Sequence, residues 1–464
     1  MKQKIILMAF VFIMAIILSG AVSATPQVSQ IYVSPDGNDA NDGATPETAV
    51  QSINVGIDYV AENGMVTLAA GTYNKSGPGD SKDVNIKISK NLTLQGAGKD
   101  STIIDALGNS QIFDIDYDLN VVIKDITFKN GKLSNSGGAI SSDATLTVHN
   151  CAFINNEAVG DGGGAIFTHT ILNLVNCVFT DNKADAGAAI FNKGGVLTVT
   201  GSTFTGNQAL TDSGKYSGGG AIHNYYGTYQ IIGNTFINNI NSAIHLTNSE
   251  TFLKTSSNEE YPLLTNKINF NRFAGNTYAI YQETDPEITS ELVDAQYNWW
   301  GSNNPNFASL IHGNIDYTPW IYMKLNSDQV KVNKGDQVPL IASFNYLYDG
   351  NTVTALDPAL GHILDGTPVL FTTNLGEVGS KSITKYTSGG VATAILRATE
   401  SGTALVTAAT DSQVTSTDVV VSASSSDSNT VNGEMVPMQS TGIPLVGLIL
   451  ALLMVTGGLI SSKK

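Results

Sequence analysis

The sequence is short of the residues that build disulfide scaffolds and nucleic-acid-binding surfaces. Its 464 residues include two cysteines, too few for a disulfide framework or a cysteine-based zinc cluster. Only 14% of the residues are charged, and 24 lysines and arginines stand against 40 acids, for a net charge of −16. A phosphate backbone or an anionic membrane surface would repel such a chain, so nucleic acid is excluded as a partner.

Apolar residues and glycine, by contrast, are plentiful. The apolar fraction of 42% is too high for a wholly disordered polymer. The length allows two or three domains. With so few cysteines, the fold must be held together by apolar burial and backbone pairing.

The N-terminus indicates export. Residues 1–24 begin with Lys2 and Lys4, continue with an apolar run and end in Val22-Ser23-Ala24. A basic start, a short apolar core and small residues at the end are typical of a secretory signal peptide. The alternative is an uncleaved N-terminal anchor.

The C-terminus indicates a membrane anchor. Residues 443–460 carry no charge, and 18 helical residues would span about 27 Å, close to the thickness of a bilayer core. Lys463 and Lys464 place the tail 461–464 in the cytoplasm. Residues 423–442, rich in Ser, Asp, Asn and Thr near their start, predict a flexible stalk. The sequence therefore predicts a single-pass cell-membrane protein with its bulk outside. Whether the anchor is retained or processed stays open.

Two motifs repeat through the middle of the chain. The first is Phe followed three residues later by Asn: Phe153/Asn156, Phe179/Asn182, Phe204/Asn207, Phe236/Asn239 and Phe273/Asn276, with Phe128 opening an imperfect first copy. Successive Phe residues are 25, 26, 25, 32 and 37 positions apart. The second is Gly-Gly-Ala-Ile or a close variant, at 137–140, 163–166, 187–190 and 219–222.

Short strands and turns with a period near 25 residues are typical of the coils of a parallel β-helix, whose strands pair only with the next coil. We therefore expect the repeated Phe and Ile to stack inside. The Asn should occupy turns, because Asn tolerates left-handed backbone, and its amide should bond to the Asn one coil above. The longer periods predict loops.

Both ends of the coil stack carry candidate caps. Ile53, Ile57 and Val60 lie at helical spacing and predict one short cap helix, with Asn63-Gly64 as its stop. At the far end we expect three tryptophans, Trp299, Trp300 and Trp320, to close the column.

The two cysteines support the coil register. Cys151 and Cys177 each lie two residues before a repeat Phe, so they occupy one position in consecutive coils. A disulfide is one possibility. Two stacked free thiols in the core are the favoured interpretation, because free Cys behaves as a small apolar residue.

The repeat ends near residue 319, and short strand patterns separated by turn residues follow over 320–422. They are 330–332, 338–342, 369–373, 391–396, 404–408 and 419–421. This pattern predicts an immunoglobulin-like β-sandwich. The expected fold class is therefore all-β: a right-handed parallel β-helix over 25–319, then an Ig-like sandwich and a C-terminal transmembrane helix.

The residues that follow the repeat Ile predict a binding surface. They are Ser141, Phe167, Phe191, His223, His245 and Tyr281. If each Ile faces inward, strand alternation turns these side chains outward, and rings of successive coils line up. Such a stripe can stack on sugars or dock a protein, so Phe167, Phe191, His223, His245 and Tyr281 are the predicted ligand-binding residues. The alternative is that the rings pack at a coil corner or under a loop.

Metal and cofactor sites are sparse. His223 and His245 are too few to hold a metal as a pair. An oxygen-rich loop comprises Asp36, Asn38, Asp39, Asn41 and Asp42, and it could bind Ca²⁺, although its spacing misses the EF-hand pattern and turn formation explains it equally well. No other cofactor is expected.

Several motifs carry family resemblances. Residues 32–39 with Gly71-Thr72-Tyr73 resemble the start of pectate-lyase-like right-handed β-helix proteins, and the two repeats resemble those of chlamydial polymorphic outer-membrane proteins. With Asn298-Trp299-Trp300-Gly301 and the anchor, the chain resembles adhesin-like surface proteins of methanogenic archaea. Residues 366–376 and 390–394 resemble invasin/intimin-type Ig-like domains. These resemblances imply surface display and adhesion to an extracellular or cell-surface polysaccharide or protein.

An enzyme is the main alternative, because β-helix lyases and hydrolases cleave acidic polysaccharides. The lyases of the resembling family usually take a proton from the sugar with an arginine. Arg272 is the only arginine in the coils, and its surroundings do not match that family's motif. No catalytic residue is therefore predicted, and the chain is expected not to be an enzyme. A purely structural envelope protein is the third possibility.

Overall fold

The computed structural model describes residues 28–77, 80–160, 162–210, 218–247, 265–283 and 291–423. The predicted signal peptide (1–24), transmembrane helix (443–460) and tail (461–464) lie outside these residues, as does nearly all of the predicted stalk. Within the described ranges, no helix reaches the length and hydropathy that crossing a bilayer requires.

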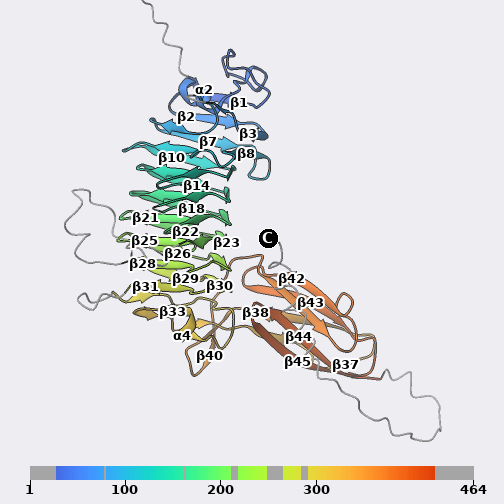
Figure 1. Cartoon of the computed structure of the whole chain (residues 1–464). Coiled ribbons are helices and arrows are strands. Elements are labelled where there is room, and N and C mark those ends of the chain that lie inside the picture. Colours follow the sequence, from blue (N-terminus) through green and yellow to red (C-terminus); the bar gives the residue numbers. More distant parts are fainter. Residues whose placement is uncertain are drawn as a thin grey trace, which may run out of the picture. The chain divides into compact units, whose positions relative to one another are not determined.

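Parallel sheets build the first part of the chain, each strand pairing with its equivalents in the neighbouring coils (Figure 1). Sheet A consists of β1 (Val28–Val33), β2 (Val60–Leu68), β7 (Leu92–Gly96), β10 (Asn120–Lys124), β14 (Thr145–His149), β18 (Ile171–Val175), β22 (Val196–Thr200), β26 (Thr228–Ile232), β29 (Lys267–Asn269), β32 (Val293–Asp294) and β34 (Ile315–Asp316). Sheet B consists of β3 (Gly71–Tyr73), β8 (Thr102–Asp105), β11 (Thr127–Lys129), β15 (Ala152–Ile154), β19 (Val178–Thr180), β23 (Thr203–Thr205), β27 (Thr235–Ile237) and β30 (Arg272–Ala274).

Two further sheets complete the coils. The ring sheet, named for the side chains on its outer face, consists of β6 (Ile86–Ile88), β9 (Phe113–Ile115), β13 (Ile140–Ser142), β17 (Ile166–Thr168), β21 (Ile190–Lys193), β25 (Ile222–Tyr225), β28 (Ile244–Thr247), β31 (Ile280–Gln282) and β33 (Ile311–His312). The short sheet consists of β12 (Lys132–Leu133), β16 (Glu157–Ala158), β20 (Lys183–Ala184) and β24 (Gln208–Ala209). One coil runs from sheet A to sheet B, through the short sheet where it is present, and on to the ring sheet. The predicted parallel β-helix is confirmed.

The repeat phenylalanines form one column inside the coils, as predicted. Phe128, Phe153, Phe179, Phe204, Phe236 and Phe273 pair in register along sheet B. Their rings stack with centroids 4.7 to 5.2 Å apart and planes within 12°. Trp300 continues the stack at 5.1 Å from Phe273. Trp299 does not close the column: its side chain is buried in the core of the second region, which corrects one of the three expected tryptophans.

The repeat asparagines form a buried amide ladder beside this column. The ladder runs from Asn156 to Asn276. The Oδ1 atom of each later Asn accepts two hydrogen bonds, from the backbone N–H and from the Nδ2 amide of the Asn one coil earlier, at 2.9 to 3.1 Å. The left-handed backbone belongs to the preceding residue instead, as at Asn155 (φ 54°) and Asn238 (φ 53°). The predicted ladder is confirmed. The left-handed conformation expected of the ladder Asn is adopted by the residue before it.

A helix covers the first coil. Helix α2 (Ile53–Tyr59) buries Ile53 and Ile57, and Gly56 lets the helix approach β1 so closely that a Cβ there would lie 2.5 Å from Val33. Val60 belongs to β2, and Asn63-Gly64 lies inside that strand, so the predicted helix stop was wrong. The remaining elements of this part are η1 (Pro46–Thr48), the hairpin β4 (Ser76–Gly77) and β5 (Asp80–Ser81), and α4 (Phe307–Leu310).

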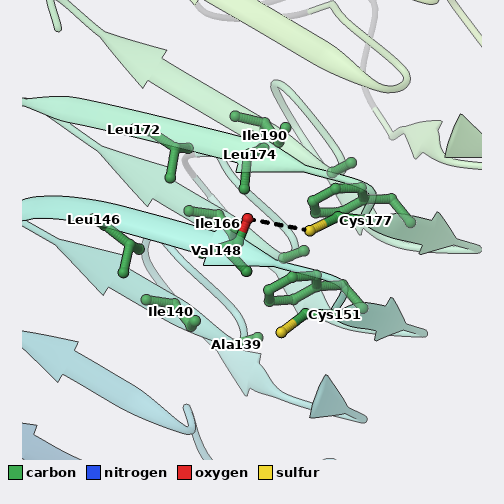
Figure 2. Close-up of a cluster of buried hydrophobic side chains, with 14 of the residues drawn as sticks. Ala139, Ile140, Leu146, Val148, Cys151, Ile166, Leu172, Leu174, Cys177 and Ile190 are labelled. Carbon is green, nitrogen blue, oxygen red and sulfur yellow. Dashed lines mark hydrogen bonds between the residues drawn. The ribbon is translucent and has the colours of Figure 1, made fainter. Parts of the chain in front are cut away.

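The cysteines are free and stacked in the core among apolar side chains (Figure 2). The Cys177 thiol donates to the carbonyl of Val148 at 3.6 Å. Burial raises the pKa of Cys177 to about 11 and raises the pKa of Cys151 well above its usual value. Both thiols are therefore protonated at neutral pH and act as core side chains.

The second region pairs its strands mainly in antiparallel fashion. One sheet consists of β36 (Lys324–Ser327), β38 (Gln337–Ser343) and β43 (Val391–Arg397). Another consists of β37 (Lys331–Asn333), β45 (Gln413–Ser422), β44 (Gly402–Thr410), β41 (Pro368–Thr373) and β42 (Ser382–Tyr386). A small sheet consists of β35 (Trp320–Ile321), β39 (Tyr346–Tyr348) and β40 (Val353–Ala355). Leu340, Phe371, Leu396 and Val406 join the two larger sheets in one core. The immunoglobulin-like assignment stays a prediction.

Candidate functional site

The ring sheet brings the predicted binding residues into one column on its outer face. Phe167, Phe191, His223, His245 and Tyr281 pair in register from coil to coil. Adjacent ring centroids lie 5.6, 5.0, 4.5 and 5.0 Å apart along the column. We call this set, extended by one member below, the outer column.

His312 is a member of the outer column that the sequence analysis missed. It pairs with Tyr281, and the two rings stack at 4.4 Å with planes 9° apart. In its coil, Leu310-Ile311 stands in place of the Ala-Ile motif of the earlier coils, and His312 follows as the ring residue of β33. The sequence signal that could have identified His312 is an Ile followed directly by a ring residue, although the glycine motif is absent there.

Most of the outer column is covered. Phe167, Phe191, His223 and His245 are at most 6% exposed, whereas Tyr281 is partly exposed and His312 is exposed. The expectation of a solvent-facing stripe therefore fails for four of the five predicted rings, and the alternative, packing beneath a coil connection, describes them. Their role in ligand binding stays a prediction.

The cover comes from the connection that follows the short sheet. Gly162, Ala186 and Gly218 form a ladder of bridges there. A Cβ on Gly162 would lie 2.3 Å from the ring of Phe191, and a Cβ on Gly218 would lie 2.1 Å from Nδ1 of His245. At Gly162 and Gly218 the connection thus crosses a ring of the following coil so closely that only glycine fits, whereas the connection between them carries Ala186 at the same position.

The cover ends where the connection shortens. The short sheet stops at β24, which is extended by one bridge from Gln208 to Ile240. In the next two coils the connection is short, because Asn239 is followed closely by Ile244 and Asn276 by Ile280, and these are the connections that precede Tyr281 and His312. Tyr281 and His312 consequently reach the surface, and Tyr278 lies edge-on to Tyr281 at 5.5 Å. We call these three residues the open end.

Two covered histidines sit just before the open end. Nε2 of His223 lies 3.0 Å from Thr247 Oγ1, and Nε2 of His245 lies 3.1 Å from Glu283 Oε1. The Nδ1 atoms of both are buried without a hydrogen-bond partner. Burial, with a smaller contribution from His245, holds the pKa of His223 well below its usual value. Among the described residues, no cluster of three metal-ligating side chains includes this pair.

The predicted calcium loop uses its oxygens internally. Asp39 accepts from the backbone N–H groups of Gln51 and Ser52 and from the Ser52 hydroxyl, at 2.6 to 2.9 Å. Partial burial opposes ionisation of Asp39, but these donors prevail and lower its pKa. Asp42 accepts from the Thr48 hydroxyl at 2.7 Å. These contacts account for the loop by turn formation, and Ca²⁺ binding stays a prediction.

Arg272 is engaged in an ion pair with the second region. Its Nε donates to Asp411 Oδ2 at 3.0 Å, and Nη2 contacts Oδ1, with the two side chains 8% and 6% exposed. The indole Nε1 of Trp299 donates to the same carboxylate at 2.7 Å. Asp411 has a φ of 51° at the tip of the β44–β45 hairpin. The guanidinium is therefore held in a structural contact.

The comparisons with known proteins agree with the fold of the coils. Residues 82–236 match the family model described as "Right handed beta helix region". These residues therefore form a right-handed parallel β-helix. No curated protein matches the sequence significantly.

Solved structures give two local likenesses. A C-terminal 282-residue fragment of intimin, in complex with the intimin-binding domain of the translocated intimin receptor, is 19% identical over 22% of this chain and 33% of its own, with a TM-score of 0.16. The D0-D1 domain of intimin is 16% identical over 21% of this chain and 46% of its own, with a TM-score of 0.15. This chain thus spans less than half the length of either. Likenesses at these TM-scores bear on neither the fold nor the function of this chain.

Proposed function

We propose that the protein is an adhesin-like binding protein of the cell surface, and that the open end of its outer column contacts a polysaccharide or protein ligand. The observation that carries this proposal is the stacked pair Tyr281 and His312, which reaches solvent at the end of a column whose other rings are covered. Aromatic faces and edges held on a regular backbone bind sugar rings and protein side chains at a low entropic cost.

The environment of the open end fits recognition better than cleavage. Glu283 lies beside it but is hydrogen-bonded to His245. Arg272, the one arginine of the coils, is buried against Asp411 and has no open path to a sugar proton. Polysaccharide lyase or hydrolase activity is the second candidate function, because the β-helix architecture resembles that of such enzymes. A purely structural envelope protein is the third.

The placement of this binding protein rests on the sequence. Export by the segment 1–24, anchoring by 443–460 and spacing by an Ig-like region and stalk would present the β-helix outside the cell. The archaeal adhesin-like resemblance supports the same arrangement. Calcium in the 36–42 loop is a further proposal, and no other cofactor is proposed.

A paired assay tests the function. The full chain, solubilised in detergent, is applied to a glycan array and to immobilised surface proteins, and in parallel is incubated with acidic polysaccharides to detect cleavage. We expect binding without cleavage, and a loss of at least tenfold in affinity in Tyr281→Ala and His312→Ala. Tyr117→Ala removes a 71% exposed tyrosine elsewhere on the coils and should bind like the parent.

Each outcome favours one class. Product release from a polysaccharide would establish the enzyme. Absence of both binding and cleavage would favour the structural role. Binding that survives both open-end substitutions would remove the open end as the site.

A further inference from the structure

We infer that a cleft beside the last coils binds an uncharged oligosaccharide. This end cleft has a volume of about 610 Å³, within the range of small-molecule sites. Its walls come from the corner after sheet B, from the segment 300–310 and from the tip of the β44–β45 hairpin. The inference rests on the proposed function only in that the protein binds a ligand, and it concerns residues outside the open end.

The cleft results from the ending of the short sheet. In the coils up to Asn207 a short-sheet strand follows the ladder Asn, as β20 follows Asn182, and after Asn239 only an isolated bridge at Ile240 remains. After Asn276 no such strand forms among the described residues, and the chain passes directly to β31. The corner next to Asn276 and Ala279 is therefore left without the strand that covers it elsewhere, and the segment 300–310 borders the space instead.

Exposed amides line the cleft mouth. Asn238, Asn304 and Asn306 all line it and are exposed. Asn306 precedes α4, yet its side chain makes no cap hydrogen bond to that helix. A carboxamide offers both donors and an acceptor, which matches sugar hydroxyls, since each hydroxyl also both donates and accepts. Asn276, by contrast, has both its Oδ1 and its Nδ2 hydrogen-bonded within the amide ladder and the backbone beside it.

The cleft carries no net charge that would recruit an ionic ligand. Asp411 is the one charged residue in its lining, and Arg272 neutralises it while Trp299 also donates to it. No lysine or arginine lines the cleft to pair with an acidic sugar, and the chain as a whole carries −16. Acidic polysaccharides are therefore repelled, and a neutral oligosaccharide fits the lining.

The apolar floor favours a sugar over a peptide. Phe273 and Trp300 line the cleft, but they are only 2% and 3% exposed because they stack at the end of the inner Phe column. The cleft therefore offers small apolar patches beneath polar rims. It has no deep apolar pocket to anchor a peptide side chain and no free charge to pair with one.

Titration calorimetry on the detergent-solubilised full chain tests the site with two probes, neutral β-glucan oligosaccharides and α-mannan oligosaccharides. Oligogalacturonate serves as the acidic comparison. We expect at least one neutral probe to bind and oligogalacturonate not to bind. Asn304→Ala combined with Asn306→Ala should weaken the neutral probe at least tenfold, and Ser309→Trp should abolish its binding by filling the cleft.

Matched controls isolate the cleft from general damage. Ala308→Trp places the same bulk on the exposed neighbour of Ser309, outside the lining, and should bind like the parent. Asn238→Gly removes a lining amide while keeping a residue suited to φ 53°, and should weaken binding. Asn155→Gly makes the same change at φ 54° in the coil of Phe153, outside the cleft lining, and should not weaken binding.

The outcomes separate this inference from the proposed function. Failure of both neutral probes, binding unchanged by the cleft variants, or tighter binding of oligogalacturonate would each overturn the end cleft. Those results leave open-end binding to a protein intact. Conversely, loss of binding in Tyr281→Ala with the cleft variants unaffected would overturn the cleft and support the open end. A peptide displacing the neutral probe would also overturn the assignment to sugar.

Discussion

The protein contains two columns of stacked rings, one inside the β-helix and one outside it. The inner Phe column repeats with ring separations of 4.7 to 5.2 Å, and its rings are buried, with only Phe273 bordering the end cleft. The outer column has comparable separations of 4.4 to 5.6 Å, but its cover is a set of glycine-containing connections that ends before Tyr281. Both columns arise from the same coil periodicity.

Alignment of rings along the coils and exposure of those rings to solvent are separate properties of this fold. Parallel pairing aligns any side chain that recurs once per coil, whether it faces in or out. Exposure is decided elsewhere, by whether the connection between sheet B and the ring sheet is long enough to fold over the rings. Function at the outer column is thus expected at the one end where that connection is short.

The inner column should be the most sensitive part of the molecule. Phe179→Ala removes a fully buried ring from between Phe153 and Phe204 and leaves a cavity, so we expect a loss of about 3–5 kcal/mol in the free energy of unfolding. Chemical denaturation measures it. A loss below about 1 kcal/mol would mean that the stack does not hold the coils together.

The last coils, next to Phe273, are joined to the second region by the ion pair of Arg272 and Asp411. Asp411→Ala leaves the Arg272 guanidinium buried without its partner, which costs about 3 kcal/mol. We expect faster proteolysis at the β44–β45 tip and a lower melting temperature. Exposed Ser412→Ala removes one bond to Gly301 at the same tip and serves as a mild comparison. Equal behaviour of the two variants would contradict a structural role for the ion pair.

The glycine cover can be broken directly. Gly218→Ala adds a Cβ against the ring of His245 at a φ of 125°, a conformation that a side chain rarely adopts, so we expect destabilisation of about 1–3 kcal/mol. Gly194→Ala also has a positive φ, 90°, but meets nothing within 4 Å, and it should cost less. A smaller loss in Gly218→Ala than in Gly194→Ala would show that the connection does not press on the rings.

The covered histidine should make the outer column sensitive to acid. The folded pKa of His223 lies below its unfolded value, so the unfolded state takes up the proton first as the pH falls. Its contribution to stability is unchanged above the unfolded pKa of about 6.5 and becomes increasingly unfavourable as the pH falls below that value. His223→Phe, which copies Phe191 of the preceding coil, should flatten this slope between pH 7 and 5. An unchanged slope in melting temperature would show that other groups govern it.

Much of the coil architecture could be predicted because it repeats. The spacing of the Phe and Asn motifs alone predicts the register of the inner column and of the amide ladder. Likewise, the β-strand patterns at 338–342 and 404–408 match β38 and β44. Each copy of a motif supports the same register, so an imperfect copy such as the one at Phe128 does not change the prediction.

The cover of the outer column was not predictable in the same way. It depends on a contact between one coil's connection and the next coil's ring, as between Gly218 and His245, and strand alternation contains no such information. The extra glycine before the repeat at 162 and 218 was a sequence signal of close approach. Trp299 and Trp300, adjacent in sequence, enter different cores because strand-like alternation turns them to opposite sides.

One measurement tests the separation of stability from binding most directly. Phe191→Ala and Tyr281→Ala are compared for unfolding free energy and for affinity to the same ligand on the full chain. The expected result is that Phe191→Ala lowers stability by about 3 kcal/mol and leaves the affinity of the folded protein unchanged, since its ring is fully covered. Tyr281→Ala should do the reverse. Equal losses of affinity in the two variants would contradict the account, because a covered ring and an exposed ring would then serve the same function.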